Sequence, residues 1–219
     1  MTSLTWKLNA DETTMACFLA FMDSNLFAQQ NDLVHMLKAG RLKNYSVSKP
    51  EITPASDRPA VSARGLTLLK GLSFSNGRIE IDLRGRDVFQ QSFLGLAFNV
   101  TDSLHYEVVY FRPFNFTAVD TLRKKHAIQY MSMPDQPWSL LRKEHPDQYE
   151  SPLSTNQAAA LWFHATILIK NDSVAVFVNH SKQPALKVKR LRQQGNNGIA
   201  LWDDGLPGDF AGLEIWADH

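Results

Sequence analysis

The side chains best suited to binding a ligand are concentrated between Tyr106 and Glu150. Aromatic rings, guanidinium groups and side-chain amides follow one another closely in this stretch. Aromatic rings stack on the C–H faces of sugars, while amides and guanidinium groups bond hydroxyls or carboxylates. We therefore expect a site for a carbohydrate or another polar small ligand, formed by Arg112, Asn115, Gln129, Tyr130, Trp138 and Arg142.

A structural role would account for the same residues. Tyr106, Tyr110 and Arg112 share one strand face by parity, and a face of this kind is not typical of a dry core. If Arg112 pairs with Glu150, however, the arginine ties the long excursion from Thr117 to Glu150 to the sheet, and the rings only cover that sheet. The sequence leaves both interpretations open.

Two carboxylates, Glu80 and Asp82, are the candidates for catalysis. They stand two positions apart in an alternating segment, so they share a strand face at a backbone separation of about 6.5–7 Å. Retaining glycosidases need two carboxyl groups about 5–5.5 Å apart. Arg78 and Arg84 flank the pair, and we favour a solvated face with cross-strand charge pairs over a catalytic one.

Three aspartates in a Gly- and Pro-containing segment, Asp203, Asp204 and Asp209, are the candidates for metal binding. Calcium takes six to eight oxygen ligands, often carboxylates and carbonyls from loops. A plain turn between two strands explains the segment as well, and we favour the turn. Calcium is the only cofactor that the sequence suggests.

The composition excludes several classes of protein. The chain has 219 residues and a net charge of +1, so it lacks the general basic field of a nucleic-acid binder. Cys17 is the only cysteine, which rules out an intrachain disulfide and a thiolate zinc site. No HExxH spacing and no Gly-rich phosphate loop occurs. The hydrophobic fraction of 44% is sufficient for a sizeable core.

Alternation of apolar and polar residues dominates the chain from Gly65 onward, and it predicts strands with one buried face. Asn171-Asp172 should form a tight turn between two of them. We expect an all-β fold, an antiparallel two-sheet sandwich of at least ten strands, with helix only near the N-terminus (33–38) and at 137–144. The expected strands include 78–84, 93–100, 106–112, 127–131, 162–170, 174–179, 186–190, 198–202 and 211–216.

The register of the strand at 162–170 follows from its pattern. Phe163, Ala165, Ile167 and Ile169 should point into the core, and the residues between them should lie on the other face. A slip of one residue would expose the whole apolar set to water, so the register should be firm.

The first thirty residues differ from the rest. Residues 15–28 are largely apolar, but Asp11 and Glu12 precede them and Asp23 interrupts them, and the run is too short for a membrane span. A degraded signal peptide, a buried helix and a disordered leader all fit. We favour the first, hence a leader at 1–30, one domain at 31–219 and a periplasmic or secreted location.

Residues 42–216 resemble the concanavalin A-like lectin/glucanase superfamily, and more narrowly a set of uncharacterised bacterial jelly-roll (LamG-like) proteins, many with secretion signals. The most specific segments are FRPFNF and IQY…PW…LR…YE. The others are FSNGRIEIDLRG, FLGLAFN, WFHATILI, VAVFVN, QPALKV and GIALWDDGLPGDFAGLEI.

The resemblance implies a jelly-roll sandwich whose concave sheet often holds carbohydrate in relatives. It does not imply catalysis, because this fold hosts lectins, glycosidases, lyases and interaction domains. Glu80 and Asp82 are similar to the ExDxE strand of laminarinase-type glucanases, but Arg84 occupies the place of its third acid. We expect a non-catalytic carbohydrate- or polar-ligand-binding domain. The alternatives are a glycoside hydrolase or lyase, and an interaction domain without a small-molecule site.

Overall fold

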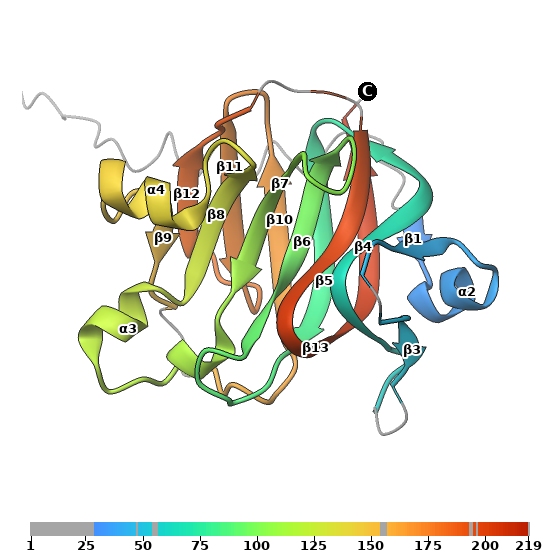
Figure 1. Ribbon diagram of the computed structural model, residues 1–219, viewed down its shortest axis with the longest axis horizontal. Helices are drawn as coiled ribbons and strands as arrows, with labels where there is room; N and C mark the ends of the chain where they lie inside the picture. Colours follow the sequence, from blue (N-terminus) through green and yellow to red (C-terminus); the bar gives the residue numbers. More distant parts are fainter. Residues whose placement is uncertain are drawn as a thin grey trace, which may run out of the picture.

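The computed structural model describes residues 29–46, 48–53, 57–153, 157–192, 195 and 197–218. Two antiparallel layers lie face to face, and strands β4 and β13 bend so that each runs through both (Figure 1). The predicted two-sheet antiparallel sandwich is confirmed. The leader expected at 1–30 lies outside the described residues apart from its last two, and among those described no helix is long and apolar enough to span a membrane.

The front layer of Figure 1 is formed by β9, β8, β7, β6, the first half of β13, β4 and β2, in that order. Its strands are β2 (Leu42–Asn44), β4 (Val61–Phe74), β6 (Ser92–Val100), β7 (Tyr106–Phe111), β8 (Ile128–Met133), β9 (Glu150–Ser151) and β13 (Asn197–Ala217).

The back layer is formed by β12, β11, β10, β5 and the second half of β13, while β1 extends β13 and β3 pairs with the start of β4. The hairpin predicted at Asn171-Asp172 joins β10 to β11. The bounds are β1 (Gln29–Asn31), β3 (Glu51–Ile52), β5 (Gly77–Arg84), β10 (Phe163–Ile169), β11 (Ser173–Val178) and β12 (Leu186–Lys189).

The core lies between the two layers, and its register is the predicted one. Phe163, Ala165, Ile167 and Ile169 are buried, and the residues between them are partly exposed. Three of the four stand opposite an apolar residue of β5, as Ile167 does opposite Ile79, and Ile169 stands opposite Gly77. The alternating pattern therefore set which face of β10 was buried.

The turn expected at Asp203–Asp209 is wrong, because β13 continues through this segment as one bent strand. Its pairing with β4 shifts register between Asp203 and Gly208, and Gly205 adopts a φ of +100° at the bend. A side chain is strongly disfavoured at that φ, so glycine allows the strand to bend without ending. β6 pairs with β13 as far as Gly205, and β4 and β5 pair with it again from Gly208 and Asp209.

The helical prediction is confirmed at two places and wrong elsewhere. Asp32 caps α2 (Leu33–Lys38), and α4 (Trp138–Glu144) begins after Pro137. The structure also contains a short 3-10 helix η2 (Pro113–Asn115) and α3 (Thr121–Lys125), which the sequence did not predict. The side chain of Asp120 accepts the amides of the first turn of α3, and this cap starts a helix too short to show a helical period.

Candidate functional site

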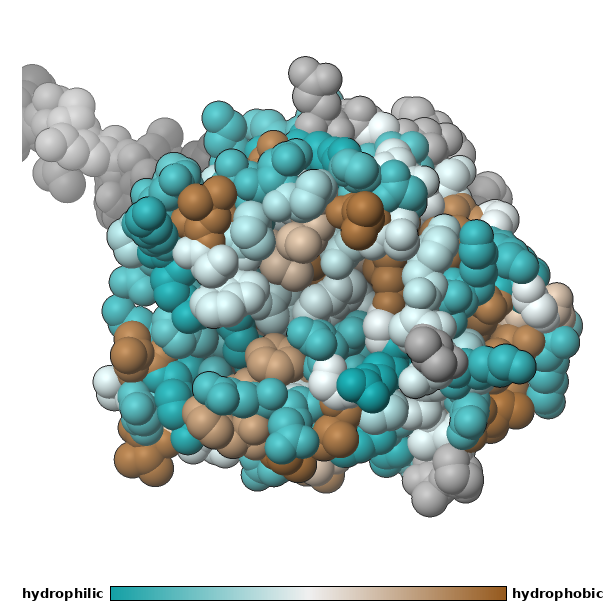
Figure 2. Space-filling model, viewed as in Figure 1, coloured by the Kyte–Doolittle hydropathy of each residue, from teal (hydrophilic) through white to brown (hydrophobic). Residues whose placement is uncertain are grey.

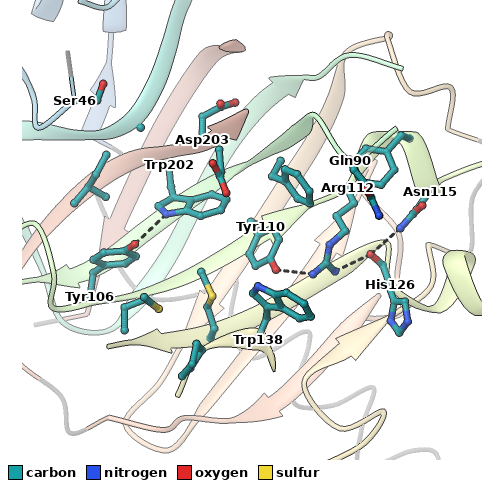
Figure 3. Close-up of a pocket in the computed structure, with 18 of the residues that line it drawn as sticks. Ser46, Gln90, Tyr106, Tyr110, Arg112, Asn115, His126, Trp138, Trp202 and Asp203 are labelled. Atoms are coloured by element: carbon teal, nitrogen blue, oxygen red, sulfur yellow. Dashed lines mark hydrogen bonds between the residues drawn. The ribbon is translucent and has the colours of Figure 1, made fainter. Parts of the chain in front are cut away.

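A cleft of about 970 Å³ crosses the outer face of the front layer. Figure 2 shows this face hollowed over the middle of the layer. Strands β6, β7, β8 and β13 provide the floor, and η2, α3 and α4 stand at one side of it (Figures 1 and 3). The cleft thus lies on the sheet formed by the strands whose side chains were predicted to bind a ligand.

The floor of the cleft is made of aromatic rings that meet across the sheet. Trp202, Gly95 and Tyr110 are neighbours in one row of the ladder. Because Gly95 has no side chain, the rings of Trp202 and Tyr110 close over it to 4.8 Å, and a Cβ there would lie 2.9 Å from the Tyr110 Cβ. Trp202 donates to the Tyr106 hydroxyl at 3.2 Å. The floor is apolar, its two central rings are tilted by 41° to each other and are only 2% (Tyr110) and 9% (Trp202) exposed, and polar groups lie at its edges.

Arg112 lies at one end of this floor and is only 6% exposed. It donates to the carbonyl of His126 at 2.9 Å, to the Tyr110 hydroxyl at 2.6 Å and to Gln129 at 3.4 Å (Figure 3). Burial raises the pKa of Tyr110 to about 12, so its hydroxyl stays protonated. The pairing of Arg112 with Glu150, on which the structural interpretation depended, is absent among the ion pairs of the described chain.

Glu150 instead holds α4 against the sheet. Arg142 of α4 donates to its two carboxylate oxygens at 3.0 and 2.7 Å, and Nδ1 of His126 lies 2.7 Å from one of them. Burial lowers the pKa of His126 despite this carboxylate. Arg142 also lies 4.9 Å from the ring of Trp138, which is 44% exposed at the rim. Trp138 is therefore a fixed, accessible ring beside the floor.

A second part of the rim, formed by Arg123 and Phe89, was not predicted from the sequence. Arg123 of α3 donates to the Phe114 carbonyl at 2.9 Å and to Asn115 at 3.3 Å, and its guanidinium lies 4.3 Å from the ring of Phe89. Phe89 is 53% exposed. Neither residue belongs to an alternating or helical pattern long enough to reveal its direction. The one local indication of α3 in the sequence was its capping residue Asp120, which precedes a basic run.

The structure brings together four of the six residues predicted to bind a ligand: Arg112, Asn115, Trp138 and Arg142 line the cleft. Gln129 lies beneath it, 1% exposed, and donates to backbone carbonyls. Tyr130 faces the interior, where its hydroxyl donates to Glu107. Adjacent strand residues point to opposite faces, so Gln129 and Tyr130 do not share one.

The two catalytic candidates lie on the outer face of the back layer, away from the cleft. His164 contacts both, with ring nitrogens 2.9 Å from Asp82 and 3.5 Å from Glu80. Arg58 pairs with Asp82 at 2.7 Å. The hydrogen bond from His164 and the surrounding positive charges lower the pKa of Glu80, and similar contacts outweigh burial at Asp82. Both groups are ionised partners in a charge network.

The three aspartates considered for calcium have different surroundings. Asp209 is buried and accepts hydrogen bonds from Arg84 and Arg86, and Asp204 is exposed. Asp203 lines the cleft but is only 4% exposed. Within the described ranges, no group of three or more His, Cys, Asp or Glu side chains is arranged to hold a metal ion. The three carboxylates do not form a common ligand shell.

Asp203 is the least compensated group of the site. The Gly208 amide approaches its carboxyl group without forming a hydrogen bond of ordinary geometry, and neither oxygen has another partner among the described residues. Burial, helped by the charge of Asp204, raises its pKa to about 8. At neutral pH Asp203 is therefore mostly protonated.

Comparison with solved structures shows the fold. A protein of unknown function with a galectin-like fold from Bacillus subtilis is 10% identical, covers 86% of this chain and 94% of its own, and has a TM-score of 0.54. A similar structure is a β-glucanase from Bacillus licheniformis, which is 9% identical, covers 90% of this chain and 94% of its own, and has a TM-score of 0.49. Another is the carbohydrate-binding module CBM66 from Bacillus subtilis, which is 11% identical, covers 86% of this chain and 95% of its own, and has a TM-score of 0.47.

No family model and no curated protein sequence matches the chain. At these identities the structural likeness concerns the fold alone. The predicted jelly-roll sandwich is confirmed at this level, because the chain shares the galectin-like fold of the Bacillus subtilis protein.

Proposed function

We propose that the chain binds a carbohydrate in the front-layer cleft and leaves it chemically unchanged. The observation that carries this proposal is the floor of the cleft, where the rings of Tyr110 and Trp202 form an apolar platform with Arg112 and Asn115 at its end. Sugar rings present flat C–H faces edged by hydroxyls, and this platform matches both features.

The fixed positions of the polar groups support binding further. Arg112 is held by three acceptors and Arg142 by both oxygens of Glu150. Side chains already ordered in the empty site lose little entropy when a ligand arrives. The cleft thus combines open space with a rigid lining.

The test is a glycan array followed by calorimetry on each positive glycan, with wild type and Trp138→Ala. Removing an accessible ring should weaken binding about tenfold or more with little change in melting temperature. Trp216→Ala is the matched control, since that indole lies on the back layer against Arg78. Equal losses in both variants, or no glycan bound by the wild type, would contradict the proposal and favour an interaction domain.

Glycoside hydrolysis is the second candidate, and Asp203 is the observation that favours it. A carboxyl group that is protonated at neutral pH can act as a general acid. Its oxygens are buried, however, and the other acid lining the cleft, Asp204, is solvent-exposed. Release of reducing sugar from a bound glycan, abolished in Asp203→Asn but not in Trp216→Ala, would establish hydrolysis in place of simple binding.

A further inference from the structure

The charge of Arg112 has no counter-ion among the described residues. Its hydrogen-bond acceptors are a backbone carbonyl, a tyrosine hydroxyl and a side-chain amide, all of them neutral. No carboxylate of the described chain lies within ion-pair distance of it. A guanidinium group remains charged at any physiological pH, and burying it without an anion costs free energy.

The neighbouring charges increase this imbalance. Arg123 is likewise bonded only to neutral acceptors, the Phe114 carbonyl and the Asn115 amide oxygen. The nearby acid, Glu150, already binds Arg142 through both oxygens and has His126 against it. One end of the cleft therefore carries more positive charge than the protein neutralises.

The other end of the cleft has the opposite character. In Figure 3, Asp203 lies beside Trp202, while Arg112 and Asn115 lie beyond the ring of Tyr110. Asp204, also in the lining, is exposed and adds a carboxylate on that side. A ligand lying along the floor would meet cations at one end and acids at the other.

We propose that the ligand is an acidic saccharide, whose anionic group, a carboxylate or a sulfate, binds at the Arg112 end of the cleft. This inference rests on the carbohydrate-binding function proposed above. The planar fork of a guanidinium group suits a carboxylate or sulfate, and such charge-assisted bonds are stronger than those to hydroxyls. The anion would supply the counter-charge that Arg112 lacks, while the sugar rings stack on the floor.

The experiment compares acidic oligosaccharides with their carboxyl-reduced, neutral forms of equal length. The probes are fragments of polygalacturonate, polyguluronate and hyaluronan, together with a sulfated oligosaccharide. At least one acidic probe should bind ten times more tightly than its neutral form, and the difference should shrink as salt is added. The class of probe that binds, carboxylated or sulfated, identifies the anion.

Variants connect the preference to Arg112. In Arg112→Gln the acidic probe should bind no better than its neutral form, and Arg112→Lys should restore part of the preference because it restores the charge. Arg84→Gln, on the far side of the protein, is the control and should keep the preference. Melting curves of each variant show that the fold is intact.

Two results would overturn the inference, and they differ in what they leave standing. If neutral and acidic forms bind equally and binding still depends on Trp138, the carbohydrate-binding proposal survives and the acidic preference fails. If no saccharide of either kind binds, both proposals fail.

Discussion

The outer faces of the two layers have similar residues but different electrostatics. Arginines lie against tryptophan rings on both, as Arg142 does on Trp138 in front and Arg78 on Trp216 behind. On the back layer each such arginine has a carboxylate partner, in the pairs Arg58–Asp82, Arg78–Glu80 and Arg84–Asp209. On the front layer Arg142 pairs with Glu150, but Arg112 and Arg123 have no carboxylate partner in the described chain.

The two faces contain similar types of residue, but they differ in whether their arginines have carboxylate partners. On the back layer the charges are satisfied within the protein, and a ligand would have to break existing pairs. On the front layer, within the described chain, two arginines without a carboxylate partner lie along an open cleft. Such groups destabilise the fold and are useful only if a ligand completes them.

Strand β13 contains Asp203, which has no partner among the described residues, and Asp209, which is paired with arginines. The largest effect on folding stability is expected at Asp203. Asp203 binds a proton in the folded state that the unfolded chain releases, since burial raises its pKa to about 8. Folding stability should therefore fall as pH rises from about 4 to about 8, by about 2–4 kcal/mol from this group. Asp203→Asn should remove that loss.

Thermal melts of wild type and Asp203→Asn at pH 4.5 and pH 8 check this expectation. The melting temperature of the variant should rise relative to that of the wild type as the pH rises. A variant that is less stable at pH 8 would mean that Asp203 has a partner, and the contrast between the layers would not extend to β13.

Asp209, the compensated aspartate of the same strand, should behave in the opposite way. Burial opposes its ionisation, but the hydrogen bonds and charges of Arg86 and Arg84 outweigh burial and lower its pKa. Asp209→Asn should cost about 2 kcal/mol at pH 7, less than for a fully buried pair because both arginines reach solvent. The cost should vanish as pH falls through the folded pKa, below about 4. Urea unfolding at pH 7 and pH 3 measures it.

His164 tests the back-layer network with a different pH range. The hydrogen bond that His164 donates to Asp82, and then the nearby carboxylate of Glu80, raise its pKa to about 9. The protonated ring stabilises the fold fully below the unfolded value of about 6.5, and this contribution of about 1–2 kcal/mol is lost as pH rises to about 9. His164→Gln should be less stable than wild type at pH 6 and equal to it above pH 9. A difference that does not change with pH would indicate packing rather than charge.

The smallest stability effect is expected at Arg112. Arg112→Met removes a buried cation without a counter-ion and also its bonds to neutral acceptors, so the two changes nearly cancel within about 1 kcal/mol. Chemical denaturation checks this value. Destabilisation of several kcal/mol would show that Arg112 is structural and that the two faces are alike.

The sequence predicted the fold better than the site because strand faces are a local property. In Arg78–Arg84 each residue's type shows which way it points, and the structure agrees. The bend of β13 was missed because Asp203–Asp209 has the residues of a turn, and only strands distant in the sequence keep it in the ladder.

The site depends on relations that local pattern does not contain. The types of Arg112 and Trp138 suggested binding, and both line the cleft. Glu150 pairs with Arg142 and not with Arg112 because of where α4 packs. Asp203 is buried because Gly208 lies beside it. Strand parity alone, in contrast, could have separated Gln129 from Tyr130.

The sharing of β13 between the two layers also has a consequence for folding kinetics. Its partners β4, β5 and β6 all lie far away in the sequence, as Val61 does beside Phe210. Closing such long loops costs entropy before the contacts compensate for it, so folding dominated by this pairing is slow. Until β13 docks, β5 and β6 have open edges and the rings of Tyr106 and Tyr110 lack Trp202. Aggregation therefore competes with the same step that creates the cleft.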